Sequence, residues 1–162
     1  MTRLLKAIRL DVSDTKVFPL AAEAGDWVIP GTFAFRAYTD EGLTGKLRQA
    51  FVSGFLSLEN FGWSTLATPA EISEEERERL LDRLCEHFVE EHGAPSIEAA
   101  RPVAEAELND TAEIASELDL NALLAVSREI DEDDGTIRES FHLVTPPGDA
   151  PHARIWDVSE DD

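Results

Sequence analysis

Apolar and polar residues follow two different periods along this chain, and each period predicts one kind of element. A two-residue alternation, typical of half-buried strands, occurs in residues 3–10, 26–29, 32–36, 61–67, 123–130 and 136–144. The last two segments flank the acidic loop 131–135 and predict a β-hairpin. Pro30-Gly31 predicts a turn between the second and third strands. Residues 17–20 predict a short edge strand, because Pro19 cannot donate to a sheet, and Pro69 ends the strand over 61–67.

A spacing of three or four residues between apolar positions predicts a first helix over 43–58. Thr44 is its expected N-cap, and Gly54 lets it pack closely against the sheet. The residues of its apolar stripe are Leu43, Leu47, Phe51, Phe55 and Leu58.

Two further helices follow in the second half of the chain. The clearer one begins at the capping box formed by Ser73 and Glu76, carries an apolar stripe to Val89, and stops before 93–95. The other begins near Pro102, a residue suited to the first helical position, after a separate turn over 96–101. We expect it to bury Ala104, Leu108, Thr111, Ala115 and Leu118.

This order of elements predicts an α+β fold. Short connections and hairpins favour a two-layer sandwich, with about three helices on one face of a mainly antiparallel sheet. Residues 1–145 fit a single α+β domain. Residues 146–162 fit an acidic, proline-rich C-terminal tail.

The charge distribution narrows the classes of partner. The chain has a formal net charge of -20, and all of it lies in residues 71–162, because residues 1–70 carry seven basic and seven acidic side chains. Such a chain repels nucleic acid and anionic lipid surfaces. No apolar run is long enough to span a membrane, and residues 1–11 lack the apolar core of a signal peptide. With Cys85 as its one cysteine, the chain is expected in a reducing cytoplasm.

The titratable residues suggest no metal, cofactor or catalytic group. His87 and Glu91 share a helical face but lack the HExxH pattern, so a solvated ion pair is the expected arrangement. The loop 131–135 does not have EF-hand spacing and reads as a solvated hairpin tip. Cys85 lies within an apolar stripe and is expected to pack in the core. Whether the chain is an enzyme is left open.

Aromatic residues concentrate in the electrically neutral first half and suggest one candidate binding region. Most are expected to be core, but a few could line a pocket or an exposed patch, with Arg36 among the cations able to hold an anion beside it. The candidate residues are Trp27, Tyr38, Lys46, Arg48, Trp63, Ser64 and Thr65.

Three segments carry a resemblance to a known family. They read LLKAIRLDVSDTKVF, GDWVIPGTFAF and LTGKLRQAFVSGFLSLENFGWST. Together they resemble a proteobacterial family of about this length whose function is unknown. The resemblance implies a cytoplasmic bacterial protein and brings no catalytic residue, cofactor or substrate with it.

Two functional hypotheses follow from these observations. In the first, the chain is a non-catalytic interaction or accessory protein that presents its acidic helices and hairpin to a basic protein partner. In the second, it is a small-molecule binding protein or an enzyme with a pocket in its aromatic N-terminal half. A two-fold homodimer is compatible with either.

Overall fold

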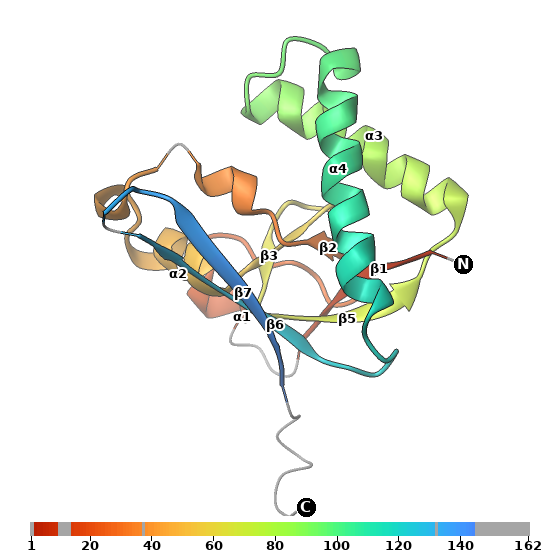
Figure 1. The fold of residues 1–162 in the computed structure, drawn as a ribbon, viewed down its shortest axis with the longest axis horizontal. Coiled ribbons are helices and arrows are strands. Elements are labelled where there is room, and N and C mark those ends of the chain that lie inside the picture. Colours follow the sequence, from red (N-terminus) through yellow and green to blue (C-terminus); the bar gives the residue numbers. More distant parts are fainter. Residues whose placement is uncertain (1, 10–13, 37, 132, 145–162) are drawn as a thin grey trace, which may run out of the picture.

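The fold is built on one seven-stranded antiparallel sheet, seen in a computed structural model that describes residues 2–9, 14–36, 38–131 and 133–144 (Figure 1). The strand order is β4-β3-β2-β1-β5-β6-β7. The bounds are β1 (Arg3–Ile8), β2 (Trp27–Ile29), β3 (Phe55–Ser57), β4 (Trp63–Ser64), β5 (Leu66–Glu71), β6 (Leu124–Ile130) and β7 (Ile137–Leu143). The predicted tail, 146–162, lies outside the described residues, and the single-domain assignment of 1–145 stays a prediction.

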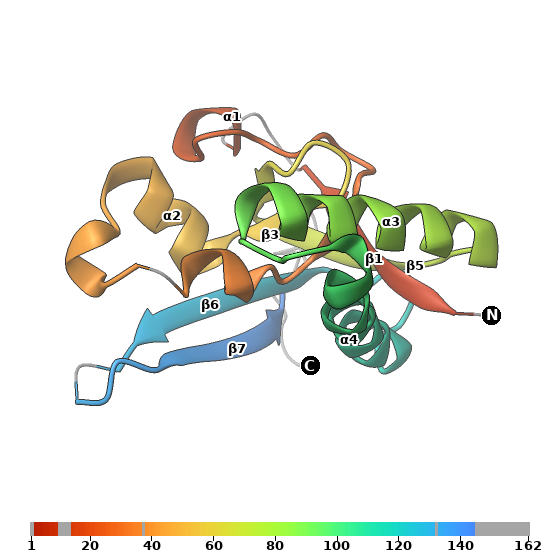
Figure 2. The same ribbon diagram turned by 90° about the horizontal axis from the view of Figure 1, so that it is seen from above.

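Both faces of the central strands are buried. Neighbouring residues of a strand point to opposite faces, so Leu4 joins one apolar cluster while Leu5 joins the other. Phe55 of β3 and Phe141 of β7 stack with their ring centroids 6.4 Å apart, although four strands lie between β3 and β7 in the sheet. The sheet is therefore strongly curled, and the hairpin of β6 and β7 reaches towards α2 (Figure 2).

The main helices are α2 (Gly45–Ser53), α3 (Glu74–Glu91) and α4 (Ile97–Ser116), and a short α1 covers Asp14–Val17. The buried residues of α2 and α3 belong to the same apolar cluster as Leu4, and so do Ala100, Ala104 and Leu108 of α4. This arrangement confirms the predicted α+β fold with an antiparallel sheet and three helices. No helix among the described residues combines the length and apolar character that a membrane crossing needs.

The predicted strand over 32–36 is wrong. Thr32–Phe35 form a 3-10 helix, η1, which begins after Gly31. Gly31 adopts a left-handed conformation, with φ 71°, and a Cβ at this position would lie 2.5 Å from Cβ of Leu56. This glycine redirects the chain after β2 has ended at Ile29. The edge strand expected at 17–20 is also replaced, because α1 extends to Val17 and the following residues form a bend.

The helix predicted over 43–58 is nine residues long. Thr44 occupies the N-cap position without a side-chain capping bond, and α2 ends at Ser53. A Cβ on Gly54 would lie 2.8 Å from both the Ala50 carbonyl oxygen and Cε3 of Trp63, so only glycine fits here. Gly54 is the C-cap of α2, and the strand β3 begins directly after it. The following residues pair as β3 instead of continuing the helix.

The strand predicted over 61–67 divides into two strands. β4 ends at Ser64, and β5 passes through Pro69 to Glu71. Pro69 pairs with Leu5 of β1, whereas the ladder between β5 and β6 contains only Leu66 and Ala67. The proline therefore lies beyond the reach of β6, where its missing N–H costs that ladder nothing.

The helix after Ser73 is confirmed, and the start of the next one is corrected. The Ser73 hydroxyl accepts a bond from the Glu76 amide at 3.2 Å. α4 begins at Ile97 rather than near Pro102, because the Ser96 hydroxyl caps it by accepting from the Ala99 amide at 3.0 Å. Pro102 then lies inside the helix.

Arg128 of β6 fastens the confirmed β6–β7 hairpin to the rest of the molecule. Its side chain is fully buried and donates to the Phe51 carbonyl at 2.9 Å and to the Pro30 carbonyl. Its Nε donates to Oγ1 of Thr32 at 2.9 Å and to a carboxylate oxygen of Glu139 at 3.0 Å. One side chain thus joins β6, β7, α2, η1 and the end of β2.

Candidate functional site

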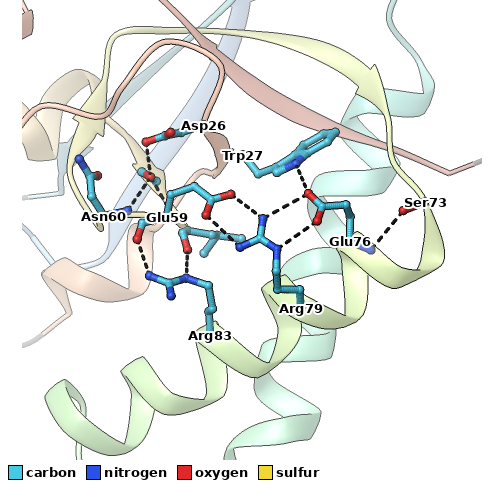
Figure 3. A network of polar contacts seen from close by, with 10 residues as sticks. Asp26, Trp27, Glu59, Asn60, Ser73, Glu76, Arg79 and Arg83 are labelled. Atoms are coloured by element: carbon cyan, nitrogen blue, oxygen red, sulfur yellow. Dashed lines mark hydrogen bonds and ion pairs between the residues drawn. The ribbon is translucent and has the colours of Figure 1, made fainter.

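Arg79 links α3 to the loop between β3 and β4 (Figure 3). Its guanidinium donates to both carboxylate oxygens of Glu59, at 3.0 and 2.8 Å, and to Glu76 at 3.0 Å. Glu76 also accepts from the Trp27 indole at 3.3 Å, so its carboxylate serves these partners rather than the reciprocal capping bond expected from the sequence. The hydrogen bonds that Arg79 donates to Glu59 and then to Glu76 raise the pKa of Arg79, and the bond from Arg79 is the main cause of a lowered pKa at Glu76.

The same loop, residues 58–62, is held by backbone contacts. Arg83 donates to the Leu58 carbonyl at 2.7 Å and to the Glu59 carbonyl. The Asn60 amide donates to the Ala21 carbonyl at 3.0 Å, and its oxygen accepts from Gly62 N at 2.7 Å. These bonds fix the loop against α3 and against the residues before β2.

Phe61, within this loop, has a backbone conformation that is rare for a residue with a side chain. Its φ is 58°, and its ring stacks on the imidazole of His87 with centroids 3.9 Å apart and planes 5° from parallel. The Arg83 guanidinium carbon lies 5.7 Å from the centre of the Phe61 ring. Strain of this kind persists only where surrounding contacts impose it. Here the contacts are those of α3 and the loop.

His87 and His92 form an aromatic group at the end of α3. The two rings meet at a centroid distance of 5.0 Å, and His92 also meets Phe33 at 5.2 Å. Burial lowers the pKa of His87 to about 4, with the neighbouring His92 as a second cause, and burial also lowers the pKa of His92. The expected solvated ion pair of His87 with Glu91 is therefore wrong, because a neutral imidazole stacks on Phe61 instead.

We expect the unfolding free energy to depend on pH through His87. The unfolded chain binds a proton at a histidine below about pH 6.5, whereas folded His87 binds one only below about 4. Between these values the unfolded state holds more protons, so stability falls as the pH is lowered. His87→Phe keeps a ring against Phe61 and cannot be protonated. Urea denaturation at pH 7 and 4.5 should show that the free energy of unfolding falls less between these two pH values for His87→Phe than for wild type.

His142→Phe provides the control, because His142 is exposed on β7. This variant should lose as much stability on acidification as wild type does. Parallel losses in wild type and His87→Phe would contradict the neutral, stacked state of His87.

A hollow of about 430 Å³ lies beside the last turns of α3. Leu20, 51% exposed, and the strained Phe61 supply its apolar part. Its acidic part consists of three exposed glutamates, Glu86, Glu90 and Glu91. Asn60, Arg83 and His87 complete the lining.

A cleft of about 450 Å³ opens between η1, the end of α3 and the beginning of α4. The buried rings of Phe33 and Phe88 meet edge to face in it, with centroids 4.8 Å apart. Arg36, His92 and the exposed Val103 also line it. The remaining lining residues are small: Ala94, Pro95, Ala99 and Ala100.

Arg36 lines this cleft, and Glu107 interacts electrostatically with Arg36. Among the described residues, no carboxylate lies within ion-pair distance of the exposed Arg36 guanidinium. Glu107 of α4 is partly buried, and burial is the main cause of its raised pKa. The charge of Arg36 opposes that rise, while Asp110 and Glu139 add to it.

Three of the seven residues proposed from the sequence, Trp27, Trp63 and Ser64, are buried. Trp27 is buried, bonds Glu76, and carries the Lys6 ammonium 4.6 Å from its ring centre. Trp63 packs against Phe35 with centroids 5.0 Å apart. The buried Ser64 hydroxyl donates to the Leu66 carbonyl at 2.9 Å.

The other four lie in different places. Tyr38 is 45% exposed, Lys46 is exposed at the start of α2, and Thr65 lies between β4 and β5. Arg48 donates to the Leu43 carbonyl at 3.0 Å. None of the seven lines the hollow or the cleft described above. A pocket or patch formed by them stays a prediction.

The remaining candidates have local roles. In the hairpin loop, Asp134 accepts from both the amide and the hydroxyl of Thr136, at 3.0 and 2.7 Å, so its carboxylate stabilises the turn. Cys85 is buried, and burial raises the pKa of its thiol. Among the described residues, no three His, Cys, Asp or Glu side chains are grouped as a metal site would require.

Residues 1–155 match the sequence profile of a family described as Family of unknown function (DUF6505). The chain belongs to this family. DUF6505 thus accounts for the resemblance found in the three sequence segments, while a bacterial origin stays a prediction. Searches for similar proteins among curated sequences and among solved structures found no match. Functional inference for this DUF6505 member therefore depends on its own residues.

Proposed function

We propose that this chain is a non-catalytic interaction protein that binds basic side chains of a partner protein at the end of α3. The hollow beside α3 carries the proposal, because it places the apolar surface of Leu20 and Phe61 next to Glu86, Glu90 and Glu91. Lysine and arginine have the complementary form, with an aliphatic stem that packs on apolar surface and a cationic end that stays near carboxylates and water.

The arginines of α3 and α4 support the proposal because all four are engaged within the molecule. Arg77 donates to Asn109 at 2.8 Å, and Arg101 pairs with Glu78 at 3.1 Å. Arg79 and Arg83 hold the loop 58–62, as described above. α3 itself carries eight acidic residues against three arginines. Among the described residues, none of these arginines pairs with Glu86, Glu90 or Glu91, so these carboxylates are available to a cationic partner.

The polarity of α3 adds to the negative charge of the hollow. A helix carries a partial negative charge at its C-terminal end, where basic residues are normally stabilising. The last turn of α3 contains no basic residue and instead holds Glu90 and Glu91. His87 does not compensate at neutral pH, because burial lowers its pKa to about 4, and burial also lowers the pKa of His92. A cation from a partner relieves this repulsion.

The net charge of -20 favours the same class of partner. A surface of one sign accelerates encounter with a basic protein, and salt weakens that attraction. It also repels a second copy of the chain, so a homodimer, which stays a prediction, would have to use another face. A cytoplasmic location likewise stays a prediction.

The test compares two charge variants in affinity purification from cells of the native host. The site variant combines Glu86→Gln, Glu90→Gln and Glu91→Gln. The control variant combines Glu113→Gln, Glu117→Gln and Asp119→Asn, exposed residues at the other end of α4, and changes the net charge equally. Wild type and control should recover the same basic partner at about 50 mM salt, and the site variant should recover at least tenfold less.

High salt should release the partner from all three proteins. Equal recovery by the site variant and wild type, or recovery that does not change with salt, would contradict the proposal. Circular dichroism of each variant establishes that a loss of partner does not come from unfolding.

A further inference from the structure

We infer that the cleft between η1, α3 and α4 is a second binding site, for a small apolar molecule that carries one carboxylate. The inference stands independently of the proposed function, because it concerns a different cavity and a ligand of opposite charge. The volume of the cleft, about 450 Å³, lies within the range of small-molecule sites. Such sites combine a mainly apolar lining with a few polar groups that orient the ligand.

The apolar part of the cleft fits an aromatic or aliphatic group. Phe33 and Phe88 are 8% and 4% exposed, so their rings lie beneath the opening rather than at its edge. Val103 is 50% exposed on the α4 side. The alanines and Pro95 leave room where larger side chains would fill the space. An apolar ligand body would cover these surfaces and remove them from water.

The guanidinium of Arg36 selects a carboxylate. Arginine presents a planar set of donors that matches the two oxygens of a carboxylate, and such charge-assisted bonds are stronger than neutral ones. Arg36 forms no ion pair with a described carboxylate, so this capacity is available. His92 adds a polar group to the lining, and burial lowers its pKa.

Glu107 gives the site a distinctive response to mutation. It interacts electrostatically with Arg36, so its carboxylate competes with a bound carboxylate for the same positive charge. Removing the Arg36 charge should weaken carboxylate binding, whereas removing the Glu107 charge should strengthen it. A residue with a merely structural role would not produce opposite effects of this kind.

Binding is measured by calorimetry at pH 7 with three ligands of nearly equal shape. They are 4-phenylbutyrate, its neutral amide 4-phenylbutanamide and the cation 4-phenylbutylamine. Wild type should bind the carboxylate about tenfold more tightly than the amide. The amine should bind more weakly than the amide. Absence of carboxylate binding, or no preference for it over the amide, would overturn the inference.

The variants locate the effect. Arg36→Met should remove the preference for carboxylate while leaving amide binding in place, and Glu107→Gln should raise carboxylate affinity about threefold without changing the amide. Lys46→Met removes an equal charge outside the cleft, so it should change neither the carboxylate affinity nor the amide affinity. Ala99→Trp fills the cleft from an exposed position and should abolish both. A preference that survives Arg36→Met would overturn the assignment.

A free carboxylic acid and the C-terminus of a peptide share this chemistry. N-acetylphenylalanine represents the peptide, and 4-phenylbutyrate represents the free acid. Tighter binding of either supports the carboxylate site and identifies its source, and failure of both overturns it. These outcomes are distinct from those of the proposed function, because the partner capture described above involves neither Arg36 nor Glu107.

Discussion

Arg128→Met is expected to lower the free energy of unfolding by about 3–5 kcal/mol. The side chain is fully buried and donates to the carbonyls of Pro30 and Phe51 and to the Glu139 carboxylate. Methionine fills much of the space but leaves these acceptors without their donor. Breaking a buried pair in this way costs more than the pair itself contributes, because the remaining polar groups stay desolvated. Urea denaturation measures the loss.

Two further substitutions separate this effect from a general loss of charge. Arg138→Met changes the same hairpin at a residue whose side chain is 64% exposed, and it should cost less than about 1 kcal/mol. Arg128→Lys keeps the charge but not the planar set of donors, so it should restore only part of the stability. If Arg128→Met cost no more than Arg138→Met, the hairpin would not be fastened as described.

Phe35→Ala should cost about 3–5 kcal/mol, through lost apolar burial and the cavity left behind. Phe35 lies on η1, is 1% exposed, and contacts the rings of Phe51 and Trp63 at centroid distances of 5.3 and 5.0 Å. It therefore joins α2 to β4 at the centre of the aromatic cluster. Thermal or urea unfolding, followed by near-ultraviolet circular dichroism of the tryptophans, reports both stability and packing.

Tyr38→Ala is the matched control, because it removes a ring from the same segment at a residue that is 45% exposed. Its cost should be within about 1 kcal/mol. Similar losses for the two variants would show that η1 is not held through Phe35.

Local signals were sufficient where a segment determines its own structure. Ser73 caps α3 and the apolar stripe behind it is buried, as the pattern indicates. The β6–β7 hairpin likewise forms around its acidic loop. In contrast, the spacing of Leu47, Phe51 and Phe55 fits one continuous helix, yet Phe55 lies in β3. The close contact between Gly54 and Trp63 is a tertiary feature that no helical period contains.

Contacts between segments that are distant in the sequence were harder to predict than the helices and strands themselves. Arg128 did have a local signal, since it lies at two-residue spacing from Leu124, Val126 and Ile130 and therefore shares the buried face of its strand. The stacking of Phe61 on His87 had none, because it joins a loop to a helix 26 residues away. The cleft combines η1 with the ends of two helices, so it exists only once those segments pack together.

The distribution of charge connects the sequence to the proposed function. The sequence alone shows that the entire net charge of -20 lies in residues 71–162. The structure adds that the arginines of α3 and α4 are engaged elsewhere and that, among the described residues, none of them pairs with Glu86, Glu90 or Glu91. It also places apolar surface beside Glu86, Glu90 and Glu91. The proposed binding of a basic partner at the end of α3 rests on these two features.

The most direct test of this proposal is zero-length carbodiimide cross-linking of the captured complex, because it joins a carboxylate only to an amine in contact with it. Mass spectrometry then identifies the linked residues. If a basic partner binds at the end of α3, partner lysines should be linked to Glu86, Glu90 or Glu91. Links that instead map to the hairpin loop or to residues 1–70, with none on α3, would contradict it.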